Sequence, residues 1–113
     1  MFRLLHHPRA LKDLAARELA RRLDAGEELQ LVDVRRPYEY HRGHIAGAVS
    51  VPLGAERRGL SDWPHDAPVV LICLSGHRSQ AAAANLLDMG FRDVSHLEGG
   101  MLAWLRARLP ISR

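Results

Sequence analysis

A single cysteine, Cys73, stands where a buried strand is predicted to end and a helix is predicted to begin shortly afterwards. Residues 68–73 form an apolar run, PVVLIC, that is typical of a strand buried on both faces. Segment 79–89 is rich in good helix formers and is followed by Gly90, a natural helix stop. A thiol at such a junction can act as a nucleophile, because the N–H groups and dipole of a helix N-terminus favour the thiolate.

The connecting loop carries groups that can surround an anion, namely Leu74, Ser75, Gly76, His77, Arg78 and Ser79. Gly76 can adopt a positive φ, which lets backbone amides converge on one centre. Arg78 offers a guanidinium suited to oxyanions, and Ser75 and Ser79 offer hydroxyl donors. The sequence leaves His77 open between a loop-facing cation and a solvated side chain.

Cys73 also has a plainer interpretation as an inert core residue, since free cysteines are among the most buried residue types. Gly76 and Arg78 together favour the functional interpretation. Asp33 and Arg35 end a second predicted strand on the same side of the sheet. We expect them to support the loop through an ion pair or a turn contact rather than by direct catalysis.

The composition indicates one domain spanning residues 1–113. One cysteine excludes an internal disulfide and a zinc site built from several cysteines. The net charge of +3 is spread along the chain, and few aromatic residues accompany it. We therefore expect no nucleic-acid partner. No apolar stretch suits a signal peptide or a membrane helix, so we expect a cytoplasmic protein without membrane contact.

Strand and helix patterns alternate, which predicts an α/β domain with a mainly parallel sheet. Beyond the segments named above, strands are expected at 29–34, 48–51 and 93–97, and helices at 15–25 and 101–109. Residues 11–14 are ambiguous and could extend the first helix. Ligands of such sheets bind beyond the carboxyl ends of the strands, where Cys73 lies.

Four motifs in order give the chain a family resemblance: LVDVR at 31–35, GHIAGA at 43–48 with Val51-Pro52 after it, CLSGHRS at 73–79 and EGGMLAW at 98–104. They are similar to the LxDVR, GHIxGA, C-x-x-G-x-R-S and EGGxxAW motifs of rhodanese domains. The resemblance covers about residues 14–109 and leaves 1–13 as an N-terminal extension, in which we expect His6 and His7 to have no role.

The resemblance implies a small α/β fold with a central five-stranded parallel sheet and helices on both faces. It also implies ping-pong sulfur transfer, in which a Cys73 persulfide forms from a small anionic donor such as thiosulfate and passes sulfur to cyanide or a thiol. No cofactor and no metal are expected. His41 and His44 have a metal-like spacing, but the resemblance makes His44 a structural hydrogen-bonding residue.

Leu74 departs from the family pattern, because many members carry a second cation directly after the cysteine. This weakens the case for a dianionic donor and leaves room for a thiol or a protein sulfur partner. Two other functions remain open: a noncatalytic binding or regulatory module, or a protein-to-protein sulfur carrier. A cysteine phosphatase is disfavoured, because those enzymes resemble C-x5-R, whereas four residues separate Cys73 from Arg78.

Overall fold

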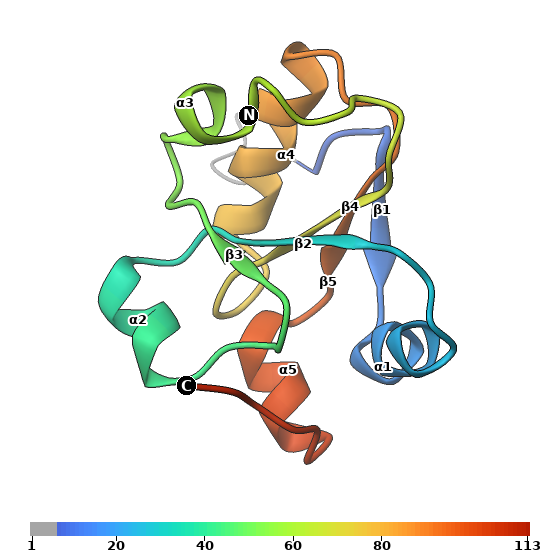
Figure 1. Ribbon diagram of the computed structural model, residues 1–113, viewed down its shortest axis with the longest axis vertical. Helices are drawn as coiled ribbons and strands as arrows, with labels where there is room; N and C mark the ends of the chain where they lie inside the picture. Colours follow the sequence, from blue (N-terminus) through green and yellow to red (C-terminus); the bar gives the residue numbers. More distant parts are fainter. Residues whose placement is uncertain (1–6) are drawn as a thin grey trace, which may run out of the picture.

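The computed structural model describes residues 7–113, so the expectation for His6 lies outside the described residues. Strands and helices alternate along the chain, as Figure 1 shows. The elements are β1 (Leu11–Leu14), α1 (Ala16–Asp24), β2 (Gln30–Asp33), α2 (Pro37–Arg42), β3 (Val49–Ser50), α3 (Glu56–Leu60), β4 (Val69–Ile72), α4 (Arg78–Asp88), β5 (Val94–Leu97) and α5 (Gly100–Arg106).

The strands form one five-stranded sheet in the order β1-β5-β4-β2-β3, and each pairing is parallel. This confirms the expected fold class. All four residues of β4 are buried, and so are all four of β5. Continuous burial follows from helices that cover both faces of the sheet. For this reason the sequence of a buried strand such as β4 is an unbroken apolar run rather than an alternation of apolar and polar residues.

Two apolar clusters fill the space between the sheet and its helices. One cluster joins the sheet to α3 and α4 through residues such as Leu60, Ala83 and Leu86. The other joins it to α1 and α5 through Leu19 and Trp104. In Figure 1 the two helix pairs accordingly lie on opposite sides of the strands. Within residues 7–113, none of the helices has the length and apolar character needed to cross a bilayer.

The structure corrects the expectation for residues 11–14, which were placed partly in an N-terminal extension. Residues 11–14 form neither an extension nor part of the first helix, but the edge strand β1, which pairs with β5 from Leu11↔Val94 to Leu14↔Leu97. Leu11 and Leu14 are buried on the sheet while Lys12 and Asp13 are exposed. With only two apolar residues three apart, this strand has a pattern that also suits a helix.

The last helix ends at Arg106, three residues before the expected end at 109. Arg108 takes a left-handed conformation at φ 59°, which turns the chain back. The indole N–H of Trp104 then donates to the Pro110 carbonyl at 2.8 Å. The buried face of α5 is formed by Met101 and Trp104, and Leu105 on the expected apolar face is 49% exposed.

The N-terminal turn of α5 packs directly on the chain that leaves β4. The N–H of Met101 donates to the Cys73 carbonyl at 2.8 Å, and that of Leu102 to the Leu74 carbonyl at 3.0 Å. This approach requires Gly100, whose φ is +60° and whose added Cβ would lie 2.4 Å from both carbonyl oxygens. The second glycine of the EGG segment is thus explained by close backbone contact.

We predict that Gly100→Ala lowers the free energy of unfolding by at least about 3 kcal/mol, because a backbone clash adds to left-handed strain. Gly26→Ala is the matched control, since Gly26 has φ +83° with nothing within 4 Å of an added Cβ. Gly26→Ala should lower the free energy of unfolding by only about 1 kcal/mol, the cost of left-handed strain without a clash. Urea unfolding of both variants tests this, and equal losses would contradict the role given to Gly100.

Candidate active site

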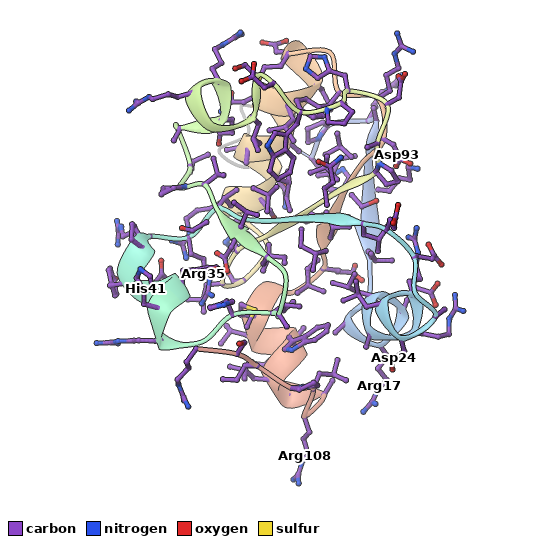
Figure 2. The ribbon with its side chains drawn as sticks, viewed as in Figure 1. Arg17, Asp24, Arg35, His41, Asp93 and Arg108 are labelled. Atoms are coloured by element: carbon purple, nitrogen blue, oxygen red, sulfur yellow. The ribbon has the colours of Figure 1, made fainter. Side chains whose placement is uncertain are left out.

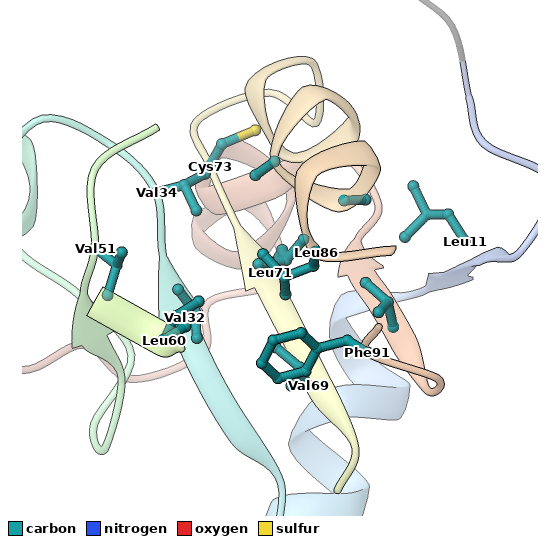
Figure 3. Packing of buried hydrophobic residues seen from close by; sticks show 13 residues of the cluster. Leu11, Val32, Val34, Val51, Leu60, Val69, Leu71, Cys73, Leu86 and Phe91 are labelled. Atoms are coloured by element: carbon teal, nitrogen blue, oxygen red, sulfur yellow. The ribbon is translucent and has the colours of Figure 1, made fainter. Parts of the chain in front are cut away.

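Cys73 follows the last residue of β4 and is fully buried. Figure 3 shows it beside Val34 at the end of the strand, with its sulfur directed toward the loop and α4. The Sγ atom accepts an N–H from Gly76 at 3.0 Å and an N–H from Ser79 at 3.3 Å. Two backbone donors on one sulfur favour a negative charge there, because hydrogen bonds to the charged form stabilise it.

The remaining loop residues divide into exposed and buried groups. Leu74, Ser75 and His77 are exposed, whereas Gly76 and Ser79 are buried against the sulfur. Gly76 has φ +98°, and a Cβ there would lie 3.3 Å from the Gly99 nitrogen. The loop therefore uses Gly76 to turn its amide inward, as the sequence predicted. His77 lies at the exposed N-terminal end of α4 without a capping contact from its side chain.

Arg78 begins α4, and its guanidinium forms a bidentate ion pair with a carboxylate. Its Nη1 and Nη2 atoms donate to the two oxygens of Glu39, on α2, at 2.7 and 3.1 Å. The bond to Glu39 raises the pKa of Arg78, and the same bond lowers the pKa of Glu39 to about 2. The charge expected to serve an anionic donor is thus largely balanced by Glu39, a residue that the sequence analysis missed.

Asp33 and Arg35 form a buried ion pair at the end of β2. Arg35 donates to both Asp33 oxygens, with the shortest contact at 2.8 Å, and its Nη2 also donates to the Gly43 carbonyl at 2.8 Å. Figure 2 shows the Arg35 side chain inside the molecule, whereas that of Arg108 extends outward. The pair ties the end of β2 to the turn that follows α2, beneath the helix that carries Glu39.

A second group of side chains reaches the loop from β5 and β1. The Ser79 hydroxyl lies 2.6 Å from Nδ1 of His96, and Nε2 of His96 lies 2.8 Å from Oδ1 of Asp13. His7 approaches the same oxygen at 2.7 Å, a contact that the sequence analysis did not predict. The pKa of Asp13 is lowered, chiefly by the hydrogen bond from His7 and further by the bond from His96, while desolvation opposes the shift.

The sequence analysis missed this group because Asp13 and His96 are 83 positions apart and meet only through the β1–β5 pairing. A strand assignment for residues 11–14 would have revealed it. Ligand atoms of His7, Asp13 and His96 lie within 4.8 Å of one another, as a metal would require. The contacts to Asp13, at 2.7 and 2.8 Å, are hydrogen-bond distances, whereas ligands around zinc stand about 3 Å or more apart.

The two histidines of the GHIAGA region lie elsewhere. The ring of His44 stacks on Tyr40 with centroids 3.8 Å apart, and its Nδ1 lies 2.8 Å from the Tyr40 carbonyl. The rings of His41 and Tyr40 lie in a T-shaped arrangement with centroids 5.5 Å apart. His44 therefore serves the turn after α2 structurally.

An open hollow of about 340 Å³ lies beside the loop, between α2 and α5. Its wall includes Leu74 from the loop, Glu39 and Arg42 from α2, and Leu105 from α5. Exposed apolar side chains surround it, with Tyr38, Leu74, Leu105 and Ile111 each at least 37% exposed. A ligand or partner that approaches the loop from this side meets an apolar surface that is bordered by the charged side chains of Glu39 and Arg42.

A family model and several relatives of known sequence indicate one family. The family model of the Rhodanese-like domain matches residues 15–107. A sulfurtransferase of Allochromatium vinosum is 38% identical over 101 residues, which cover 89% of this chain and 94% of that protein. The probable adenylyltransferase/sulfurtransferase MoeZ of Mycobacterium tuberculosis is 41% identical over 99 residues, which are 86% of this chain but 25% of that protein.

The crystal structure of a thiosulfate sulfurtransferase from Pseudomonas aeruginosa has a TM-score of 0.81 and 30% identity to this chain. The match covers 93% of this chain and 21% of the other. The chain thus corresponds to a fraction of MoeZ and of the Pseudomonas protein, but to nearly the full length of the Allochromatium protein.

We predict that the Arg78–Glu39 pair stabilises the fold above about pH 4.5 and ceases to do so as the pH falls toward 2. The pKa of Glu39 is lowered from 4.5 to about 2, so the folded state holds this carboxyl ionised more tightly than the unfolded chain does. Wild type should exceed Glu39→Gln in unfolding free energy by on the order of 2 kcal/mol at neutral pH. Urea unfolding across this range tests the claim, which a pH-independent difference would contradict.

Proposed function

This chain belongs to the rhodanese-like domain family, and from that membership we propose that it is a sulfurtransferase that carries sulfane sulfur on Cys73. The observation that supports this most is the pair of backbone N–H groups, from Gly76 and Ser79, that donate to the Cys73 sulfur. Donors fixed before the reaction stabilise charge on sulfur without reorganisation. The same amides can hold the negative charge of a persulfide.

The proposed reaction has two steps. The Cys73 thiolate attacks the outer sulfur of thiosulfate, so that a new S–S bond forms while the old S–S bond breaks and its electron pair leaves with sulfite. Cyanide or a thiolate then attacks the outer sulfur of the persulfide and releases the Cys73 thiolate. Each step conserves atoms and charge, and the persulfide splits one displacement into two. We propose the cytoplasm as the location, since a free thiol persists there.

The size of the loop favours sulfur over phosphate. In the short loop after Cys73, the amides of Gly76 and Ser79 converge on a single sulfur atom, whereas a phosphoryl group presents three oxygens and requires a wider ring. Arg78, which a phosphatase would need over those oxygens, is held by Glu39 at 2.7 Å. The geometry therefore supports sulfur transfer over phosphate hydrolysis.

A protein-to-protein sulfur carrier is the second candidate, and the surface beside the loop favours it. Leu74, directly after the nucleophile, is 37% exposed where a small dianion would need a cation. Tyr38, Leu105 and Ile111 continue the apolar surface around the hollow. Exposed apolar groups beside a reactive loop suit a protein donor or acceptor better than free thiosulfate.

We predict that incubation with thiosulfate adds the mass of one sulfur atom to wild type and none to Cys73→Ser. The substitution removes the chain's single thiol while leaving a side chain of similar size. Intact mass spectrometry checks this, with circular dichroism as the control for folding. Sulfur added equally to both proteins would contradict a persulfide on Cys73.

We also predict opposite effects from the two halves of the ion pair on anionic donors. Arg78→Ala leaves Glu39 uncompensated near the loop and should raise the KM for thiosulfate at least about tenfold, or about 1.4 kcal/mol. Glu39→Gln leaves Arg78 uncompensated and should lower that KM. Steady-state assays with thiosulfate and with an uncharged persulfide donor test this. Equal increases in both variants would show that the pair shapes the loop rather than setting its charge.

A further inference from the structure

A continuous line of polar side chains leads from the buried sulfur to the surface at the β1 edge. The Cys73 Sγ atom lies 3.5 Å from the Ser79 hydroxyl, which lies 2.6 Å from Nδ1 of His96. Nε2 of His96 lies 2.8 Å from Asp13. Ser79 and His96 are buried, whereas Asp13 is 47% exposed, so the line ends in water.

The hydrogen-bonding capacity of each group sets a direction along this line. An ionised carboxylate only accepts, so Nε2 of His96 carries the proton that it shares with Asp13. In a neutral imidazole Nδ1 is then an acceptor, and the Ser79 hydroxyl donates to it. The serine oxygen is left to accept from the Cys73 thiol, which the loop amides already prepare for negative charge.

We propose that Ser79, His96 and Asp13 form a relay that removes the thiol proton of Cys73 before sulfur transfer. The S–H bond breaks and its electron pair stays on sulfur. Its proton passes to the Ser79 oxygen as the hydroxyl proton passes to Nδ1 of His96. The resulting imidazolium is stabilised by Asp13, which acts as a positioning residue. This inference rests on the proposed function, because it supplies the thiolate that the function requires.

The groups that face the relay are compatible with it. The Gly76 carbonyl lies 3.1 Å from the Ser79 hydroxyl and can accept its proton once His96 is protonated. Arg78, next in sequence, is turned toward Glu39. His7 shares Asp13 with His96, and its own pKa is raised by that carboxylate. Nδ1 of His7 donates to the Pro8 carbonyl and Nε2 donates to Asp13, so both ring nitrogens carry protons and His7 is a cation. His7 and His96 therefore share the negative charge of one carboxylate.

The test is the rate at which iodoacetamide alkylates Cys73 at about pH 7 and at about pH 9.5, where a model thiol ionises without help. His96→Gln keeps the hydrogen-bonding shape but cannot take a proton, and Asp13→Asn removes the charge that stabilises imidazolium. Asp93→Asn is the matched control, because it breaks the exposed Lys12–Asp93 pair across the same two strands.

We expect His96→Gln to slow alkylation at least about tenfold at neutral pH and no more than about twofold at alkaline pH, as loss of a general base would. Asp13→Asn should show a smaller change of the same kind, and Asp93→Asn none. The ratio between the two pH values cancels any change in access to the buried sulfur. An equal loss at both pH values in His96→Gln would overturn the relay, as would the neutral-pH loss in Asp93→Asn.

Two further measurements distinguish a failure of the relay from a failure of the proposed sulfur transfer. Alkylation requires no sulfur donor, so a relay seen without persulfide formation would retain the inference while removing the proposed function. Wild type treated with a chelator should keep its alkylation rates. A change on chelation would show a metal bound by His7, Asp13 and His96, and would overturn the relay as stated.

Discussion

The site depends on two backbone hydrogen bonds that hold the start of the loop from behind. The carbonyls of Cys73 and Leu74 accept N–H groups from the first turn of α5, so the peptide planes after β4 cannot rotate freely. With the carbonyls fixed on one side, the amides of Gly76 and Ser79 face the sulfur on the other. The sheet order supports this arrangement, because β5 lies directly beside β4 and delivers α5 to that point.

Charge around the loop is balanced pair by pair rather than left positive. The buried Asp33–Arg35 pair secures the turn after α2, and the helix so placed presents Glu39 to Arg78. Each carboxylate offsets the charge of an arginine that would otherwise attract anions. In the proposed sulfur transfer, the attraction on an anionic donor would therefore come mainly from backbone dipoles, which are short-ranged. Such a site discriminates by close approach and shape more than by long-range steering.

The sequence predicted what local patterns encode. The apolar run of β4, the helix formers of α4 and the single cysteine between them were enough to single out Cys73 as the proposed nucleophile. The structure has those elements within about one residue of their expected bounds. Helices α2 and α3 were missed, since segments of six and five residues carry too few turns to show a period. Partners from distant segments, such as Glu39 for Arg78, have no local signature.

The misassigned strand had the largest consequence. Residues 11–14 owe their conformation to pairing with β5 rather than to their own propensity, and a tertiary cause is invisible in a short window. Yet this edge strand brings Asp13 opposite His96 in the register. A buried histidine needs a partner for each ring nitrogen, and β1 and α4 supply one each. Edge strand β1, although distant in sequence from Cys73, is thereby connected to it through a line of hydrogen bonds. By this line the exposed carboxylate of Asp13 can influence the buried sulfur.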